Sequence, residues 1–384
     1  MLTNTVTSIG TNLIFGLIAL VGIGFIIAFH EFGHFLFCKL FKIRTPSFSI
    51  GFGPRLITKK IGDTEFALSA IPVGGYVEIA GAAEVGQGEQ LEAYSSDEHS
   101  FKNKPWYQKA LVMLGGILFN LMFAYFTCSL LFMIGMPPSI MLYPRNATPV
   151  VSQVVSDSPA AKAGLQVNDT IISINNQAIA EDNAQQLIET LQAAANTPVH
   201  LQVERNGQQL GIDFTPEQKE FLGKKVGSSG IGLKMRSLPP VPFSKAISEG
   251  IALTNSIMKT TVSIFRHIFS SGDTSIVGGP IMIISQSMKH TQLGFKNFLF
   301  FLAYLSVSLA ILNIIPLPIL DGGQLLVYTI EAIIGHSIPD RVREYIHIAC
   351  WIGFLALLIL LSAQDLKMIL KPYLEHIYSF FGYK

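Results

Sequence analysis

The stretch His30-Glu31-Phe32-Gly33-His34 decides the fold, because it lies in an apolar segment long enough to cross a membrane. From Leu13 to Phe29 the chain has no charged residue, and apolar residues continue through 35–37. On a helix, His30 and His34 are one turn apart on the same face, so both imidazoles can bind one Zn²⁺ ion. Glu31 can take the proton of a zinc-bound water. The sequence therefore predicts hydrolytic metal chemistry inside a membrane span.

The composition also favours a membrane protein. Charged residues make up 14% of the 384 residues and apolar residues 49%, whereas a soluble domain typically has roughly 25% charged residues. The net charge of +1 argues against a nucleic-acid partner. The three cysteines, Cys38, Cys128 and Cys350, lie in separate apolar segments and predict no disulfide framework.

Four segments are apolar enough to cross a bilayer, and they predict a polytopic α-helical membrane protein with about four transmembrane helices. These segments are approximately Ile9–Phe37, Ala110–Met136, Phe298–Ile315 and His347–Ala363. The predicted organisation is a first span with HExxH (1–38), a cytoplasmic or membrane-re-entrant β-loop region (39–109), a second span (110–136), a soluble domain (150–221), a region with an amphipathic helix (222–296), a third span (297–323), a cytoplasmic segment (324–344), a fourth span (345–370) and a C-terminal tail (371–384).

The basic residues predict the orientation of these spans. Residues 1–29 contain no Lys or Arg, whereas the stretch from Lys39 to Lys109 contains nine. By the positive-inside rule this stretch is cytoplasmic, so the N-terminus, the C-terminus and the long segment between spans two and three are outside.

Asp321 is the candidate third ligand. Spans one and three run in the same direction, and Asp321 follows span three, so it can reach the depth of His30 and His34. Catalytic zinc sites typically have three protein ligands and an open fourth position. Taken alone, Asp321-Gly-Gly is more often a turn, and Cys38, one turn beyond His34, is more simply a structural thiol.

Two further regions lie between the spans. Residues 48–81 predict a β-hairpin that ends in Gly74-Gly75 and whose strand edge could hold an unwound substrate segment by β-addition; a plain cytoplasmic hairpin is the alternative. From Phe243 to Phe269, apolar residues recur at helical spacing and predict an amphipathic helix on the outer membrane surface.

The soluble domain, 150–221, resembles a PDZ domain. Its segment from Ser158 to Asn175 resembles the bacterial PDZ signature, and its second half predicts a hairpin with a type I′ turn at Asn206-Gly207. Such a domain could bind peptide ends or strands, or it could act as a size gate that excludes untrimmed substrates.

HEFGH in the first span, together with N-x-x-P-x-P-x-L-D-G from Asn313 to Gly322, resembles the site-2 protease family of intramembrane zinc metalloproteases. The resemblance is closest to the bacterial regulator-of-sigma-E protease type, here with a single PDZ domain. Weaker sequence matches extend the resemblance over most of the chain, namely Gly74-Gly75-Tyr76-Val77, Gly115-Gly116 with Asn120, and Gly278-Gly279-Pro280. Ile117 and Met282 depart from residues common in the family.

The resemblance implies one Zn²⁺ per chain, bound by His30, His34 and Asp321, with Glu31 as the general base. It implies that Asn313 holds the substrate, that Gly74, Gly75 and Tyr76 contribute to substrate binding, and that Pro316 and Pro318 break the helix before Asp321. An interhelical hydrogen bond inside the membrane is the alternative role of Asn313.

The expected activity is hydrolysis of a peptide bond in the transmembrane segment of a single-pass protein, such as an anti-sigma factor or a remnant signal peptide, in regulated intramembrane proteolysis at the bacterial inner membrane. Two alternatives compete with this enzyme. A membrane zinc transporter requires a polar pathway that spans two and four do not offer, and a non-catalytic PDZ-bearing scaffold predicts a broken HExxH motif.

Overall fold

The protein forms two compact units in the computed structural model: Met1–Thr127 with Ser271–Lys384, and Cys128–Ser270. The structure describes residues 2–82, 92, 95, 97–139, 142–180, 184–221, 224–272 and 278–380.

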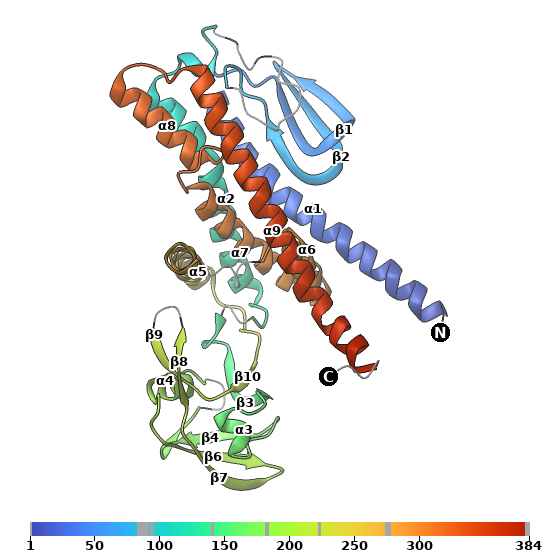
Figure 1. The fold of residues 1–384 in the computed structure, drawn as a ribbon, viewed down its shortest axis with the longest axis vertical. Helices are drawn as coiled ribbons and strands as arrows, with labels where there is room; N and C mark the ends of the chain where they lie inside the picture. The colour runs from blue at the N-terminus through green and yellow to red at the C-terminus, as the bar shows by residue number, and fades with distance from the viewer. Residues whose placement is uncertain are drawn as a thin grey trace. The chain divides into compact units, whose positions relative to one another are not determined.

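The first unit is a bundle of helices with a β-hairpin (Figure 1). Its helices are α1 (Leu2–Leu40), most of α2 (Trp106–Ile134), α6 (Pro280–Gln292), α7 (Phe295–Asn313), α8 (Asp321–Ile334) and α9 (Asp340–Phe380), with a short 3₁₀ helix η1 (Phe101–Asn103). Among the described residues, four helical segments are long and apolar enough to cross a membrane: Gly10–Leu40, Trp106–Ile134, Phe295–Asn313 and Arg341–Leu370. They correspond to the four segments expected from the sequence. Helix α9 also runs through most of the expected tail at 371–384, of which 381–384 lie outside the described residues.

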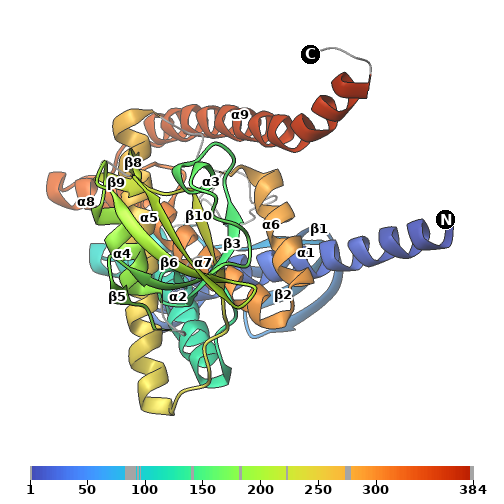
Figure 2. The ribbon, with the colours of Figure 1, turned by 90° about the horizontal axis from the view of Figure 1, so that it is seen from below.

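Apolar side chains pack α1 against α7. Ile23 and Ile26 of α1 form a buried cluster with four residues of α7, namely Phe298, Phe301, Leu302 and Leu305. The short helix α6 packs against α1, α7 and α9 (Figure 2). These contacts hold the end of α7 close to the second half of α1.

The chain breaks between α7 and α8, at the segment with two prolines. Helix α7 ends at Asn313 and α8 begins at Asp321, so Pro316 and Pro318 lie outside both helices, as expected. Proline lacks the N–H group that a helix interior needs, and it disfavours helical geometry in the residue before it. The expected third span at 297–323 therefore consists of α7, the proline segment and the first residues of α8, and the rest of α8 lies in the expected cytoplasmic segment.

The predicted hairpin at 48–81 is confirmed as β1 (Ser47–Ile61) and β2 (Thr64–Val77). Its register shifts several times, so that Phe48 pairs with both Phe66 and Val77, and the two strands curl into a small sheet beside α1 (Figure 1).

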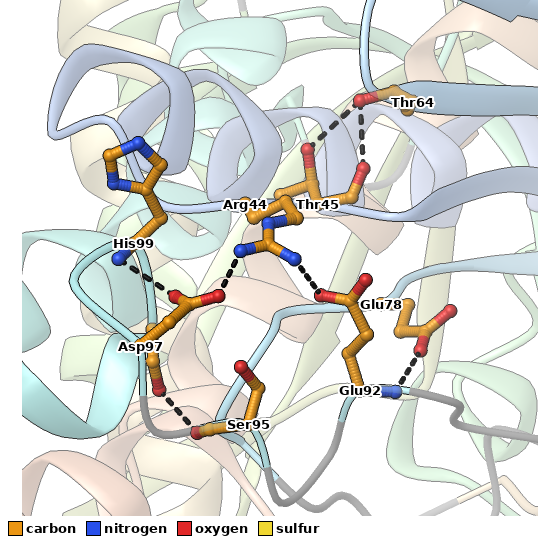
Figure 3. Close-up of polar contacts among 9 residues, drawn as sticks. Arg44, Thr45, Thr64, Glu78, Glu92, Ser95, Asp97 and His99 are labelled. Atoms are coloured by element: carbon orange, nitrogen blue, oxygen red, sulfur yellow. Dashed lines mark hydrogen bonds and ion pairs between the residues drawn. The ribbon is translucent and has the colours of Figure 1, made fainter.

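Polar contacts close the base of this hairpin (Figure 3). Arg44, just after α1, pairs with Glu92 at 3.0 Å and with Asp97. The backbone N–H of Glu92 donates to Glu78, which follows β2, at 3.1 Å. The start of β1 and the end of β2 are thus linked to the segment before α2.

The second unit contains the PDZ-like domain. Its strands are β3 (Ala147–Val154), β4 (Thr170–Ile174), β5 (Gln177–Ala178), β6 (Val199–Arg205), β7 (Gln208–Phe214), β8 (Glu217–Phe221), β9 (Lys224–Ser228) and β10 (Ile231–Met235), and its helices are α3 (Pro159–Lys162) and α4 (Gln185–Ala193). The main sheet has the order β10-β3-β4-β6-β7, with β5 on β4, and β8 pairs with β9. The predicted hairpin is confirmed, because β6 and β7 pair around Asn206 and Gly207, which both have positive φ.

The predicted amphipathic helix is α5 (Phe243–Ser271). One face buries small and apolar residues, including Ala246, Gly250 and Leu253, whereas Ile247, Ile251 and Val262 on another face are exposed. An exposed apolar stripe of this kind is typical of a helix that lies at a membrane surface.

Candidate metal centre

His30 and His34 face each other on the second half of α1. Their Nε2 atoms are 3.1 Å apart, and both residues are less than 10% exposed. Because residues i and i+4 of a helix share one face, the pair is set by the helix itself.

Asp321 approaches the same point from the first turn of α8. Its carboxylate oxygens lie 3.2 Å from Nε2 of His30 and 3.5 Å from Nε2 of His34. One ligand atom from each of the three residues lies within 4.8 Å of the others. The sequence-predicted ligands are therefore brought together across almost three hundred residues of chain.

Helix α2 forms the wall behind the histidines. Nδ1 of His34 lies 2.8 Å from the backbone carbonyl oxygen of Val112, which can accept its N–H. At Gly116 a Cβ atom would overlap both imidazoles. The absence of a side chain at Gly116 thus leaves space for the two rings.

A cavity of about 360 Å³ opens onto this centre. It is lined by Glu31, by Asn313 and Gln324, and by Gly75 and Phe52 of the hairpin, with Trp351 from α9. Nδ2 of Asn313 lies 3.3 Å from Nε2 of His30. Gly75 belongs to β2, so this strand also reaches the site.

The hairpin residues predicted to bind substrate take different positions. Gly75 lines the cavity, whereas Gly74 and Tyr76 are not among its lining residues. Gly74 has φ +90° and packs against the ring of Phe52, on which Tyr76 also stacks. Arg55 donates a hydrogen bond to the Tyr76 hydroxyl at 3.2 Å.

Cys38 lies in a buried apolar cluster that includes Ile43, Val112 and Phe101, and it is not one of the three clustered ligands. This supports the structural role expected for its thiol.

Several residues at the site had no role predicted from the sequence, including Val112, Gln324 and Trp351. Asn120 was noted only as part of a motif, yet its side-chain amide lies 3.2 Å from Nδ1 of His30. Its position one turn after Gly116 on the same helix face is a signal that could have identified it.

The donor atoms fit a metal cation. Oδ2 of Asp321 is buried and accepts no hydrogen bond of good geometry from the described residues. A carboxylate oxygen and two imidazole nitrogens that converge in a buried place are unfavourable together unless a cation or protons join them. Two imidazoles and one carboxylate, with an adjacent cavity, are a donor set of catalytic zinc.

An HExxH helix joined by a distant carboxylate, in a bundle of apolar helices, defines a metalloprotease. The chain belongs to peptidase family M50, whose family model matches residues 18–360.

Relatives match over most of their length. A Synechocystis protein with the name "Putative zinc metalloprotease" is 31% identical over 96% of this chain and 99% of its own. The regulator of sigma-E protease RseP of Salmonella typhimurium is 28% identical over 85% of this chain and 92% of its own. Among solved structures, the PDZ domain of an SdrC-like protein from Listeria monocytogenes matches 23% of this chain and 87% of its own at 21% identity, with a TM-score of 0.20.

Proposed function

We propose that this protein is an intramembrane zinc metalloprotease of the site-2 type, which hydrolyses a peptide bond within the transmembrane segment of a membrane protein. The observation that carries the proposal is the convergence of His30, His34 and Asp321 within 4.8 Å, beside Glu31 and a cavity, on helices apolar enough to cross a membrane.

His30, His34 and Asp321 would hold one zinc ion through the two Nε2 atoms and the carboxylate. Bound zinc supplies a Lewis acid that activates water and polarises a carbonyl group. Within the described part of the chain no fourth ligand joins these three residues, and the cavity adjoins them, so one coordination position could stay open for water.

Glu31 is proposed as the general base. It lines the cavity next to both histidines, and its carboxylate can accept a proton from the attacking water and return it to the leaving nitrogen.

Asn313 and the hairpin are proposed to hold the substrate. The side-chain amide of Asn313 lines the cavity near His30, where it can donate to a peptide carbonyl. A substrate helix buries its peptide groups in its own hydrogen bonds, so it must unwind before water can attack. The edge of β2 around Gly74, Gly75 and Tyr76 could pair with the unwound segment.

Proline substitutions along residues 66–78 test this role of the hairpin, because proline removes an N–H from the strand. Well-folded variants that cleave at the wild-type rate would rule it out.

The substrate is proposed to be a single-pass membrane protein at the bacterial inner membrane, an anti-sigma factor or a remnant signal peptide, cut in regulated intramembrane proteolysis. The basic residues between Lys39 and Lys109 support a metal centre near the cytoplasmic side, with both termini and the PDZ-like domain outside.

The PDZ-like domain is proposed to bind an extended peptide. A cavity of about 300 Å³ lies beside β10, an end strand of the main sheet, and is lined by Ile188 and Leu191 of α4 and by residues 228–230, which run from the last residue of β9 to β10. A strand could add to β10 there. Deletion of residues 150–220 tests the alternative size gate, because a gate predicts cleavage of untrimmed substrate after the deletion.

The decisive experiment is the Glu31→Gln variant with a single-pass substrate in lipid vesicles. Loss of the general base should slow cleavage by about 10²–10⁴-fold while zinc content stays at the wild-type level. Wild-type cleavage by the variant would refute the mechanism. Removal of zinc from the wild type with a membrane-permeant chelator should also stop cleavage, and added zinc should restore it.

A further inference from the structure

Asn120 of α2 contacts the ring nitrogen of His30 that does not face the other candidate ligands. Its side-chain amide lies 3.2 Å from His30 Nδ1, whereas Nε2 of the same ring lies 3.2 Å from the Asp321 carboxylate. Asn120 is 1% exposed and lines the cavity beside His30.

The chemistry of a metal-bound histidine fixes what Asn120 must do there. A histidine that binds a metal through Nε2 carries its proton on Nδ1, and the partner of Nδ1 must accept a hydrogen bond. The acceptor in an asparagine side chain is Oδ1, since Nδ2 only donates.

The orientation of the Asn120 amide decides whether an acceptor atom faces Nδ1–H of His30. With Nδ2 toward the ring, Oδ1 is buried and has no hydrogen-bond partner among the described residues. A half-turn of the carboxamide exchanges oxygen and nitrogen with almost no change of shape, and it brings Oδ1 to the Nδ1–H donor.

We propose that Asn120 is a positioning residue of the metal centre, whose Oδ1 accepts a hydrogen bond from Nδ1–H of His30 and keeps Nε2 directed at the zinc. This inference rests on the proposed function, because it requires zinc at His30. His34 has the matching arrangement, with Nδ1 at 2.8 Å from the Val112 carbonyl oxygen. Helix α2 therefore orients both imidazoles, one through its backbone and one through a side chain.

Asn120 also contacts α7, the helix that leads to Asp321. The hydroxyl of Ser306 in α7 donates to the backbone carbonyl of Asn120 at 2.9 Å, and Ser306 is fully buried. Helix α7 leads to Asn313 and, after the bend, to Asp321. The Ser306 bond thus ties α2, which contacts His30, to the helix that precedes Asp321.

The test is the zinc affinity of the full-length protein in lipid nanodiscs, measured by competition with a chelator of known affinity. Asn120→Leu keeps a similar volume but removes the acceptor, and it should weaken zinc binding about 10–100-fold. Asn120→Asp keeps an acceptor oxygen at Nδ1 and should bind zinc about as tightly as the wild type. Ser308→Ala is the matched control: the Ser308 hydroxyl donates to the Tyr304 backbone carbonyl within α7 at 3.1 Å, so its loss leaves the contacts of Asn120 in place and zinc binding should be normal.

Wild-type affinity in Asn120→Leu would overturn the inference, and so would an Asn120→Asp variant as weak as Asn120→Leu. If the Leu variant does not fold, the Asp variant decides alone, since weakened zinc binding in it contradicts the role. A wild-type protein that binds zinc but cleaves no peptide bond would refute the proposed function and leave this inference standing. A wild type that binds no zinc would refute both.

Discussion

Gly33 of α1 and Gly115 of α2 cross in backbone contact: a Cβ atom on Gly33 would overlap the carbonyl oxygen of Gly115, and one on Gly115 would come within 2.7 Å of that of Gly33. Small residues at such crossings let two helices in a membrane approach closely. Gly33 lies inside the HExxH motif, so this crossing sets the distance between the histidines and the wall that α2 forms behind them.

Gly33→Ala should therefore destabilise the protein, because two helix backbones must separate to admit one methyl group. Overpacking of this kind typically costs about 1–3 kcal/mol. Thermal unfolding of the detergent-solubilised protein measures the loss. Gly10→Ala in the same helix is the matched control, since a Cβ atom there meets nothing within 4 Å. Equal melting temperatures for both variants would contradict the close crossing.

Gly116→Ala should act on the metal rather than on the helix contact. A methyl group there would overlap the imidazoles of His30 and His34 and push Nε2 of each away from its place. On the proposed function, zinc affinity should fall by at least the roughly 10–100-fold that follows loss of ligand-supporting contacts. Metal content after dialysis against a chelator measures this. Gly353→Ala, at an open position in α9, should retain its zinc.

Asp365→Leu should loosen α6 from α9. Both carboxylate oxygens of this buried residue accept backbone N–H groups at the start of α6, from Gly279 at 2.9 Å and from Met282 at 2.8 Å. The variant leaves two buried donors unpaired, at about 1–3 kcal/mol each. Hydrogen exchange of residues 280–292 should become faster, and Asp365→Asn, which keeps one acceptor, should give an intermediate rate. Ser362→Ala, one turn away, serves as the control, and exchange that is equally slow in all variants would refute the contact.

The sequence was sufficient for the features that depend on local pattern. The spacing of His30 and His34 and the Asn206-Gly207 turn are short-range signals, and the structure shows a helix and a hairpin at these places. The place of Asp321 near the histidines followed from the direction of two spans, because parallel spans bring their ends to one side of a membrane.

Contacts between distant segments were not predictable in the same way. Strand β10 lies beyond the expected end of the PDZ-like domain at 221, yet it pairs with β3, the first strand of the sheet. Alternation of apolar and polar residues shows that one face of a strand is buried, but it does not show which other strand pairs with it. Likewise, the apolar period of α2 identifies a span, but it does not show that Asn120 faces His30. Both contacts, β10 with β3 and Asn120 with His30, depend on how the whole of each unit packs.

Acid should weaken the PDZ-like domain through Asp169, which is 1% exposed. Burial acts to raise the pKa of this carboxyl group, but hydrogen bonds from Arg205, at 2.6 and 2.7 Å, and from the Gln166 backbone N–H outweigh it and lower the pKa below its ordinary value. Because the pKa is lower in the folded state, the ionised carboxylate stabilises the fold above the unfolded value of about 3.9, and this contribution is lost as pH falls through the folded pKa.

Asp169→Asn removes this titration. At pH 7 the variant should be less stable than the wild type by about 1.5–3 kcal/mol, the range for hydrogen bonds to a charged group, and the difference should shrink below pH 4. Hydrogen-exchange protection factors of β4 and β6 in the full-length protein, at pH 7, 5 and 3.5, measure it. Asp213→Asn is the matched control: Asp213 pairs with His200 at 2.7 Å but is 78% exposed, so its removal should change protection little. A stability difference between wild type and Asp169→Asn that stays constant down to pH 3.5 would show that the ionised carboxylate of Asp169 does not support this domain.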